Sequence, residues 1–280
     1  ALYLDEVQTL LWKVQTFGFH FASLDIRQNS AIHNQVVEAV VRHLGQNAYA
    51  DGDEKFKIDQ LAKVQGKVHS SDFERPIVMQ TLASIEAMQT IQNQNGELGC
   101  NRYIISNNES ALNVLETLAM FRWVGWENPS VDIVPLFESV DDLQQAASIM
   151  EQLYKHPEYP ANLERRDKTQ TVMLGFSDGT KDGATLRAKW SIFKAKEAIT
   201  AMSRKYGIEV IFFDGRGGPP ARGGGKTHKF YASLGSGIEH KEIQLTVQGQ
   251  TISSNFGTPD SCRFNLENLL SAGISNGLFA

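Results

Sequence analysis

The sequence predicts an α/β fold in which parallel strands are joined by crossover helices. Apolar or alternating runs typical of strands are followed by stretches with helical periodicity, and this pattern repeats along the 280 residues. Charged residues fall at or just after the ends of several predicted strands. In parallel sheets and barrels, ligands bind at the carboxyl edge of the strands. The sequence therefore also predicts a ligand site at that edge.

The N-terminal third contains the first elements of this pattern. Apolar residues at helical intervals over residues 4–17 predict a helix that ends at Gly18. An apolar run over residues 19–26 predicts a short strand, and a second stripe over residues 32–44 predicts another helix. Residues 46–75 are polar and mixed in charge, and we expect them to form an exposed excursion that includes a short helix.

The later elements follow the pattern more regularly. Strands are predicted over residues 103–106, 131–137, 171–176, 208–213 and 243–247. A helix is predicted from about Ser110 to Trp123, and Ser139 with Asp142 resembles a capping box that begins the next one. A long helix ending at Gly207 has a predicted inward face of Leu186, Trp190, Phe193 and Met202.

Composition excludes several classes of function. The net charge is −5, which opposes broad binding of a polyanion such as a nucleic acid. No apolar run approaches the length that spans a bilayer, so we expect no membrane association. The two cysteines have no metal-binding spacing, which indicates a reducing, cytoplasmic location.

A glycine-rich segment over residues 214–225 is the richest candidate for binding. Its glycines let backbone N–H groups approach an anion, and Arg216 and Arg222 can each bind phosphate or carboxylate oxygens. A flexible linker is the structural alternative, but the segment follows directly on a predicted apolar strand. An RGG-type RNA-binding module is a further alternative, although the segment lacks repetition and interleaved aromatic residues.

Acidic and basic residues follow three other predicted strands. Asp178 and Lys181 lie in a strand-to-helix turn, where a carboxylate suits a hard cation and a helix N-terminus suits an anion. Glu138 could supply a second oxygen ligand to Mg²⁺ or Mn²⁺. Each also has a structural interpretation: capping for the turn, an acidic helix start for Glu138, and an Asp25–Arg27 pair at the first strand.

Several segments together resemble the phosphoenolpyruvate carboxylase family. Residues 24–30 (LDIRQNS) are similar to its LDIRQES segment, and residues 134–139 (VPLFES) are similar to its VPLFET segment. Residues 173–182 resemble its M-I-G-Y-S-D-S-x-K-D motif, and the glycine-rich segment resembles F-H-G-R-G-G-x-x-G-R-G-G. Residues 246–250 and Phe256-Gly257 resemble T-x-Q-G-E and F-G. These motifs occur in family order, so the resemblance covers essentially the whole chain and implies a partial (β/α)8 TIM-like barrel with additional helices.

The resemblance implies roles for single residues. Glu138 and Asp178 would hold Mg²⁺ or Mn²⁺. The residues that would bind the phosphate of phosphoenolpyruvate are Arg27, Arg216, Gly217 and Gly218. Lys181 and Arg222 would assist the bicarbonate half of the reaction. In this family bicarbonate attacks the phosphorus, and carbon dioxide released from the resulting carboxyphosphate joins the enolate to form oxaloacetate.

The resemblance also implies that this chain is the central portion of a larger, homo-oligomeric (tetrameric) enzyme. The family's T-A-H-P-T and R-P-x-x-R segments are absent from the sequence, so we expect the chain alone to be inactive and some apolar surface to be exposed or covered by another copy. Asp214 and Ala221 stand where the family has His and Gly, and Gly179 also departs from the pattern. Another metal-dependent barrel enzyme that handles phosphoenolpyruvate or pyruvate remains an alternative.

Overall fold

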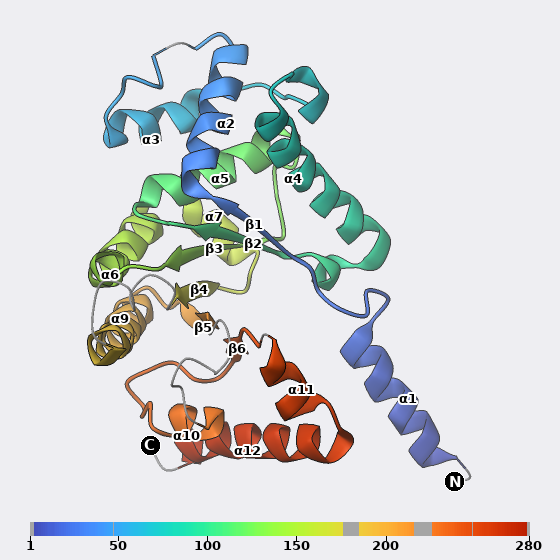
Figure 1. Ribbon diagram of the computed structural model, residues 1–280. Helices are drawn as coiled ribbons and strands as arrows, with labels where there is room; N and C mark the ends of the chain where they lie inside the picture. Colours follow the sequence, from blue (N-terminus) through green and yellow to red (C-terminus); the bar gives the residue numbers. More distant parts are fainter. Residues whose placement is uncertain (1–2, 47, 176–184, 216–225, 248, 279–280) are drawn as a thin grey trace. The chain divides into compact units, whose positions relative to one another are not determined.

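The chain has an α/β fold made of parallel strands and helices. The computed structural model describes residues 3–46, 48–175, 185–215, 226–247 and 249–278 (Figure 1). The strand order is β1-β2-β3-β4-β5-β6, the same as the order along the chain. Consecutive parallel strands in this order are typical of part of a (β/α)8 barrel, which confirms the predicted fold class. No described helix combines the length and the apolar content that a membrane-crossing helix requires.

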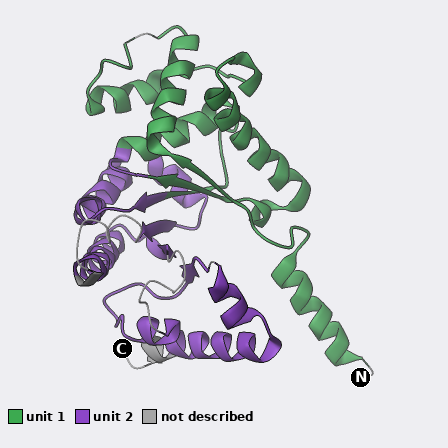
Figure 2. Cartoon of the chain, viewed as in Figure 1, with its two compact units in different colours: residues 1–106, 112–134 green, residues 107–111, 135–280 purple. Residues whose placement is uncertain are grey.

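The chain divides into two compact units (Figure 2). Unit 1 comprises residues 1–106 and 112–134, and unit 2 comprises residues 107–111 and 135–280. Each of them contains strands and its own set of buried apolar residues.

Unit 1 contains two parallel strands and the helices beside them. β1 (Asp25–Asn29) pairs with β2 (Arg102–Ser106). The helical elements are α1 (Leu4–Phe17), α2 (Ser30–His43), α3 (Glu54–Lys63), η1 (Ser70–Asp72), α4 (Pro76–Asn95), η2 (Glu97–Gly99) and most of α5 (Ala111–Trp123). α2 and α4 contact each other, and Val36, Val40, Leu82 and Ile85 are fully buried there.

The structure differs from the prediction at the first strand. Residues 19–24 are not a strand; β1 begins only at Asp25, where the chain first pairs with Arg102 of β2. Phe19 and Phe21 of the expected strand are exposed. An apolar run forms a strand only where a neighbouring strand accepts its hydrogen bonds, and this run has such a neighbour from Asp25 onward.

The segment expected to be an exposed excursion, residues 46–75, contains the helix α3 and four apolar side chains that are buried. These side chains are Tyr49, Leu61, Val64 and Val68. The long helix α4 was not predicted. It begins at Pro76, and its buried residues recur at helical spacing, as at Val78, Leu82 and Ile85.

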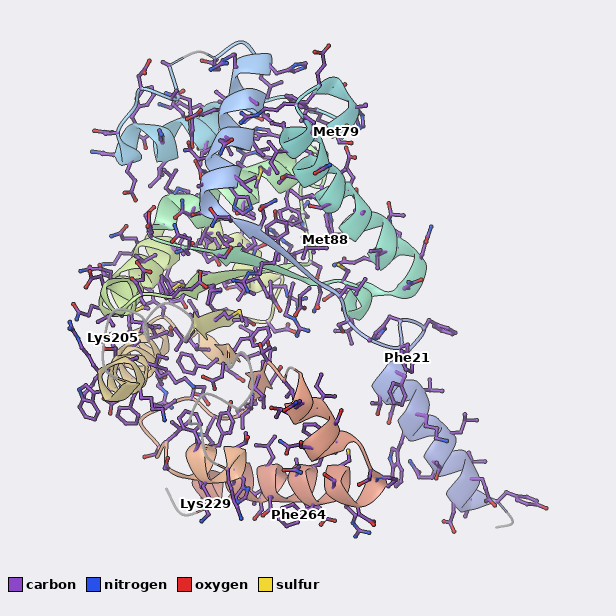
Figure 3. The ribbon with its side chains drawn as sticks, in the orientation of Figure 1. Phe21, Met79, Met88, Lys205, Lys229 and Phe264 are labelled. Atoms are coloured by element: carbon purple, nitrogen blue, oxygen red, sulfur yellow. The ribbon has the colours of Figure 1, made fainter. Side chains whose placement is uncertain are left out.

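α1 confirms the predicted helix, but none of its side chains is buried. Its exposed large apolar residues are Leu4, Val7, Leu10, Leu11, Trp12, Val14 and Phe17. Phe21, which is labelled in Figure 3, stacks on Phe17 with ring centroids 5.6 Å apart. This helix therefore supplies the exposed apolar surface that the sequence led us to expect.

If copies of the chain associate through α1, Leu10→Glu should weaken that association about tenfold, because burying a leucine contributes about 1.5–3 kcal/mol. Sedimentation velocity over a concentration series measures the effect. Leu98→Glu, which changes an equally exposed leucine outside α1, should leave association unchanged. Equal effects of the two substitutions would contradict a specific role of α1.

Unit 2 contains the remaining strands, all parallel. β3 (Asp132–Phe137, of which the last three residues belong to this unit) pairs with β4 (Thr169–Gly175), β4 with β5 (Glu209–Gly215), and β5 with β6 (Ile243–Leu245). The helices are α6 (Val140–Lys155), α7 (Tyr159–Glu164), α9 (Thr185–Lys205), α10 (Thr227–Ala232), α11 (Gln250–Phe256) and α12 (Pro259–Leu278). α6 packs on α9, and α10 and α11 each contact α12.

The long helix α9 corrects one prediction about orientation. Trp190 is 58% exposed rather than inward, and it stacks on Phe193 with ring centroids 5.7 Å apart. The buried face instead contains Ile192, Lys196 and Ile199. The buried stripe of α9 thus includes a lysine, which the apolar pattern alone could not reveal.

Candidate active site

The carboxyl ends of β3, β4 and β5 lie in one row. The parallel register pairs Phe137 with Leu174 and Leu174 with Asp214. One residue further on, Gly175 pairs with Gly215, and Glu138 follows Phe137 at the same level. β3, β4 and β5 therefore end at one edge of the sheet, which is the edge where the sequence predicted a ligand site.

Glu138 directly follows β3 and is half-buried. Its Oε2 accepts a hydrogen bond of 3.0 Å from the backbone N–H of Asn107. The capping box of α6 is formed by other residues, as predicted: Asp142 N–H donates to Ser139 Oγ, and Ser139 N–H donates to Asp142 Oδ2, each at 3.0 Å. The helix cap is thus complete without the carboxylate of Glu138.

Gly175 leaves space for the side chain of Glu138. A Cβ atom at this position would lie only 3.2 Å from Glu138 Cγ and 3.2 Å from Leu136 Cδ1. The methylenes of Glu138 therefore lie over the end of β4, in a space that any larger residue at position 175 would narrow. A carboxylate at this edge is the kind of oxygen donor that Mg²⁺ or Mn²⁺ takes.

Asp214 lies in the same row and forms a buried ion pair. Lys196 Nζ lies 2.8 Å from Asp214 Oδ1 and 2.9 Å from Oδ2, and Tyr231 Oη donates to Oδ2 at 2.6 Å. Lys196 Nζ also lies 5.3 Å from the ring centroid of Phe212 and 5.5 Å from that of Phe230. This ion pair connects β5 with α9 and α10, and it gives a structural reason for an aspartate at position 214.

The sequence reasoning missed the partners of Asp214. The signal for Lys196 was its place four residues after Ile192 and three before Ile199, on the inward stripe of a helix. A lysine in such a stripe requires a buried acidic partner. An aspartate that ends an apolar strand is the natural candidate for this partner.

Arg27 lies in the middle of β1 rather than after its end, opposite Ile104. Arg27 is exposed and belongs to unit 1. Asp25, which the structural alternative paired with Arg27, accepts a hydrogen bond from Arg102 Nε at its Oδ1, at 2.7 Å. Asn29 caps α2 by accepting from the N–H of Ala31.

The other predicted site residues lie outside the described residues. They are Asp178, Lys181, Arg216, Gly217, Gly218 and Arg222. Within the part of the chain that the structure describes, no group of three or more His, Cys, Asp or Glu side chains could hold a metal ion. The roles predicted for these six residues therefore stay predictions.

A second buried polar cluster lies in unit 1. Glu116 of α5 is fully buried, and its Oε1 accepts hydrogen bonds from Tyr49 Oη at 2.9 Å and Asn34 Nδ2 at 3.1 Å. Oε2 is buried with no hydrogen-bond partner among the described residues. Burial raises the pKa of Glu116 to about 7, against the opposing effects of Tyr49, Asn34 and the charge of Lys57.

His33 is buried beside this cluster. One ring nitrogen lies 3.0 Å from Tyr103 Oη and the other lies 3.2 Å from Thr117 Oγ1. Burial lowers the pKa of His33 to about 3, so its imidazole is neutral at physiological pH. Unit 1 therefore contains a histidine and a carboxyl group whose neutral forms are favoured by burial.

Comparison with known proteins gives a single family. The sequence matches the family described as phosphoenolpyruvate carboxylase over residues 1–280. It is 32% identical to the phosphoenolpyruvate carboxylase of Parasynechococcus marenigrum over 98% of this chain and 28% of that protein. It is 34% identical to that of Nitrosomonas eutropha over 97% of this chain and 30% of that protein. For Gloeobacter violaceus the identity is 33%, over 96% of this chain and 30% of that protein.

Proposed function

Because this chain belongs to the phosphoenolpyruvate carboxylase family, we propose that it carries the metal- and phosphate-binding part of an enzyme that converts phosphoenolpyruvate and bicarbonate to oxaloacetate and phosphate. The chain spans about 30% of the length of the curated relatives it matches. The complete activity, a cytoplasmic location and a homo-oligomeric assembly are therefore proposals for the larger protein. The observation that carries the proposal is the alignment of Glu138, Gly175 and Gly215 at one carboxyl edge.

Glu138 and Asp178 are the proposed ligands of Mg²⁺ or Mn²⁺. A divalent cation bound there would offset the negative charge that develops on phosphoryl and enolate oxygens. Glu138 supports this role because its Cγ methylene lies beside Gly175, and Gly175 is three residues before Asp178 in the chain. A hard cation of this kind takes one or two carboxylates together with substrate and water oxygens.

The arginines and glycines are the proposed phosphate-binding residues. Arg27 and Arg216 would donate charged hydrogen bonds to the phosphate of phosphoenolpyruvate, and Gly217 and Gly218 would offer backbone N–H groups. Arg216 directly follows Gly215, the last residue of β5, in the sequence.

Lys181 and Arg222 are the proposed residues for bicarbonate. Bicarbonate oxygen attacks the phosphorus while the bond between phosphorus and the enol oxygen breaks, which gives carboxyphosphate and the enolate. Carboxyphosphate then releases carbon dioxide and phosphate, and the enolate carbon forms the new bond to carbon dioxide. Two cations near the transferring groups would stabilise the negative charge in each of these steps.

We expect the 280-residue chain to bind phosphoenolpyruvate weakly and only with Mg²⁺, without forming oxaloacetate. Arg216→Ala should weaken this binding at least about tenfold, since hydrogen bonds to charged groups contribute about 1.5–3 kcal/mol. Titration calorimetry measures the binding, and an assay coupled to malate dehydrogenase measures oxaloacetate.

Arg263→Ala is the matched control, because Arg263 is exposed on α12 and pairs only with Glu267 among the contacts described. Its phosphoenolpyruvate affinity should equal that of the unchanged chain. Formation of oxaloacetate by the chain alone would show that the missing family motifs are dispensable. Binding that is independent of Mg²⁺ would contradict the proposed metal site.

A further inference from the structure

The connection between α2 and α3 contains a strap, residues 48–53, that is anchored by one side chain. Tyr49 is buried, while the other residues of the strap are exposed or half-buried. Tyr49 Oη donates to Oε1 of Glu116 at 2.9 Å, and Glu116 lies 67 residues further along the chain, on α5. The other hydrogen bonds described for the strap are local: Gly52 N–H donates to the carbonyl oxygen of Tyr49 at 3.2 Å, and Asp53 caps α3. Among the contacts described, Tyr49 therefore anchors the strap to α5.

The chain after α3 is attached to the same helix more firmly. Trp123, the last residue of α5, is fully buried. Its Nε1 donates to the carbonyl oxygen of Val64 at 3.1 Å, and its own carbonyl oxygen accepts from the N–H of Val68 at 2.8 Å. The strap can therefore separate from α5 while residues 64–68 stay in place.

The anchor ends on a carboxyl group whose two oxygens have unequal partners. Oε1 of Glu116 accepts from Tyr49 Oη and from Asn34 Nδ2, whereas Oε2 is buried with no hydrogen-bond partner in the part of the chain that the structure describes. A buried carboxylate with too few hydrogen bonds costs free energy, and water restores them where the site opens. Asn34 belongs to α2, which packs on α4, so Tyr49 is the donor that can move.

Burial keeps the other titratable groups of this cluster neutral. The pKa of His33 is lowered to about 3, so its imidazole carries no charge between pH 6 and pH 8. Burial raises the pKa of Tyr49 and that of Tyr103 above the ordinary value of 10.0, so both phenols stay protonated. Glu116, whose pKa burial raises to about 7, is the member of this buried cluster that changes charge in this range.

Two charged residues lie at the half-buried edge of the cluster. Lys57 of α3 has its Nζ 5.3 Å from the ring centroid of Tyr49, and its charge favours the ionised form of Glu116, as Asn113 also does. Glu38 of α2 carries a charge that opposes ionisation of Tyr49. Burial outweighs the groups that favour the charged carboxylate, so the closed strap favours the protonated form of Glu116.

We propose that residues 48–53 are a pH-sensitive strap: loss of the proton from Glu116 releases Tyr49 and hydrates the carboxylate, and protonation closes the strap again. The pKa of Glu116 in the closed form lies above its ordinary value of 4.5, so closure is favoured at low pH and loses this advantage as the pH rises from 4.5 to about 7. The opening equilibrium should therefore rise about tenfold between pH 6 and pH 8. This inference goes beyond the proposed function and does not depend on it.

Acetylation of tyrosine hydroxyls by N-acetylimidazole, quantified by peptide mass spectrometry, tests the proposal. Tyr49 Oη reacts when it has left Glu116, so its rate follows the open fraction. Tyr3 is 67% exposed and is the internal reference for the reagent, and Tyr103, fully buried in the same unit, reports unfolding of the unit as a whole. The rate ratio of Tyr49 to Tyr3 should rise about tenfold from pH 6 to pH 8, while Tyr103 stays protected.

Glu116→Gln removes the titrating group and keeps an oxygen acceptor for Tyr49. In this variant the ratio of Tyr49 to Tyr3 should stay within about twofold between the two pH values. Glu38→Gln is the matched control, because it removes the other carboxylate whose charge acts on Tyr49. The rise of about tenfold should persist in Glu38→Gln.

Three results would overturn the proposal. A ratio that is equal at pH 6 and pH 8 in the unchanged chain would show that the strap stays closed on the ionised carboxylate. A rise that persists in Glu116→Gln, or that disappears in Glu38→Gln, would assign the effect to another group. Parallel acetylation of Tyr103 would show that the whole unit opens. Should Glu116→Gln not fold by circular dichroism, the unchanged chain decides: about fivefold of the rise must fall between pH 6 and pH 7.

Discussion

Replacement of Lys196 by methionine is expected to lower the free energy of unfolding by about 3–5 kcal/mol, because it leaves the Asp214 carboxylate buried without its cation. Lys196 and Asp214 are 1% and 3% exposed at their side chains, so water cannot take the place of the missing partner. Tyr231 would remain as a donor to Asp214, but one neutral hydrogen bond does not neutralise a buried charge. Urea denaturation followed by circular dichroism measures the loss.

Lys194→Met on the same helix is the matched control. Lys194 pairs with Glu197 at 2.7 Å, but its side chain is 55% exposed. Exposed ion pairs contribute about 0–1 kcal/mol, so this substitution should have little effect. Adding Asp214→Asn to Lys196→Met should recover part of the stability, since no unpaired charge then remains. Similar losses for Lys194→Met and Lys196→Met would contradict the importance of burial.

The second large effect is expected at Glu116, as a stability that depends on pH. Burial favours its protonated form and raises its pKa from the ordinary value of 4.5 to about 7. Below pH 4.5 the folded and unfolded chains are both protonated there, and Glu116 costs nothing. As the pH rises from 4.5 to about 7, the unfolded chain releases this proton first, so stability falls. Above about pH 7 the cost is constant, at about 3 kcal/mol.

Glu116→Gln removes this cost while keeping an oxygen acceptor for Tyr49 and Asn34. At pH 8 we expect the variant to be more stable than the unchanged chain by about 1–3 kcal/mol, with an advantage below about 1 kcal/mol at pH 5. Comparing Glu116→Gln with the unchanged chain at each pH also cancels the contribution of His33. Because the pKa of His33 is lowered, its contribution to stability rises with pH below pH 6.5, which is opposite to that of Glu116. Urea denaturation at the two pH values measures the difference.

Glu127→Gln is the control for this experiment. Glu127 lies in the same unit and pairs with Lys67, but its side chain is 62% exposed. Its substitution should change stability by less than about 1 kcal/mol at either pH. An advantage of Glu116→Gln that is equal at pH 5 and pH 8 would show that ionisation of Glu116 is not its cause.

Local signals in the sequence predicted the elements whose formation depends on neighbouring residues. The capping box of Ser139 and Asp142 spans four residues and needs no distant partner. The strand that ends in Phe137 is a compact apolar run, and it placed Glu138 correctly at its end. Where a pattern is local, physical chemistry at short range is enough to predict it.

Features that depend on distant segments were not predicted. Asn107 and Glu138 are 31 residues apart, and only the fold brings the amide to the carboxylate. The apolar stripe of α1 predicted a helix correctly, but periodicity cannot say whether a stripe is covered. The position of Arg27 was misjudged because the end of β1, at Asn29, is determined by its pairing with β2.

The row formed by the ends of β3, β4 and β5 limits how the chain can change in length. Deleting one residue inside β4 would remove Gly175 from its present level, and a residue with a Cβ there would lie only 3.2 Å from Glu138 Cγ. Insertions before Thr169, by contrast, leave that level unchanged, because they lengthen the connection at the amino end of the strand. Variation in length should therefore be tolerated at the amino ends of these strands, which lie away from Glu138.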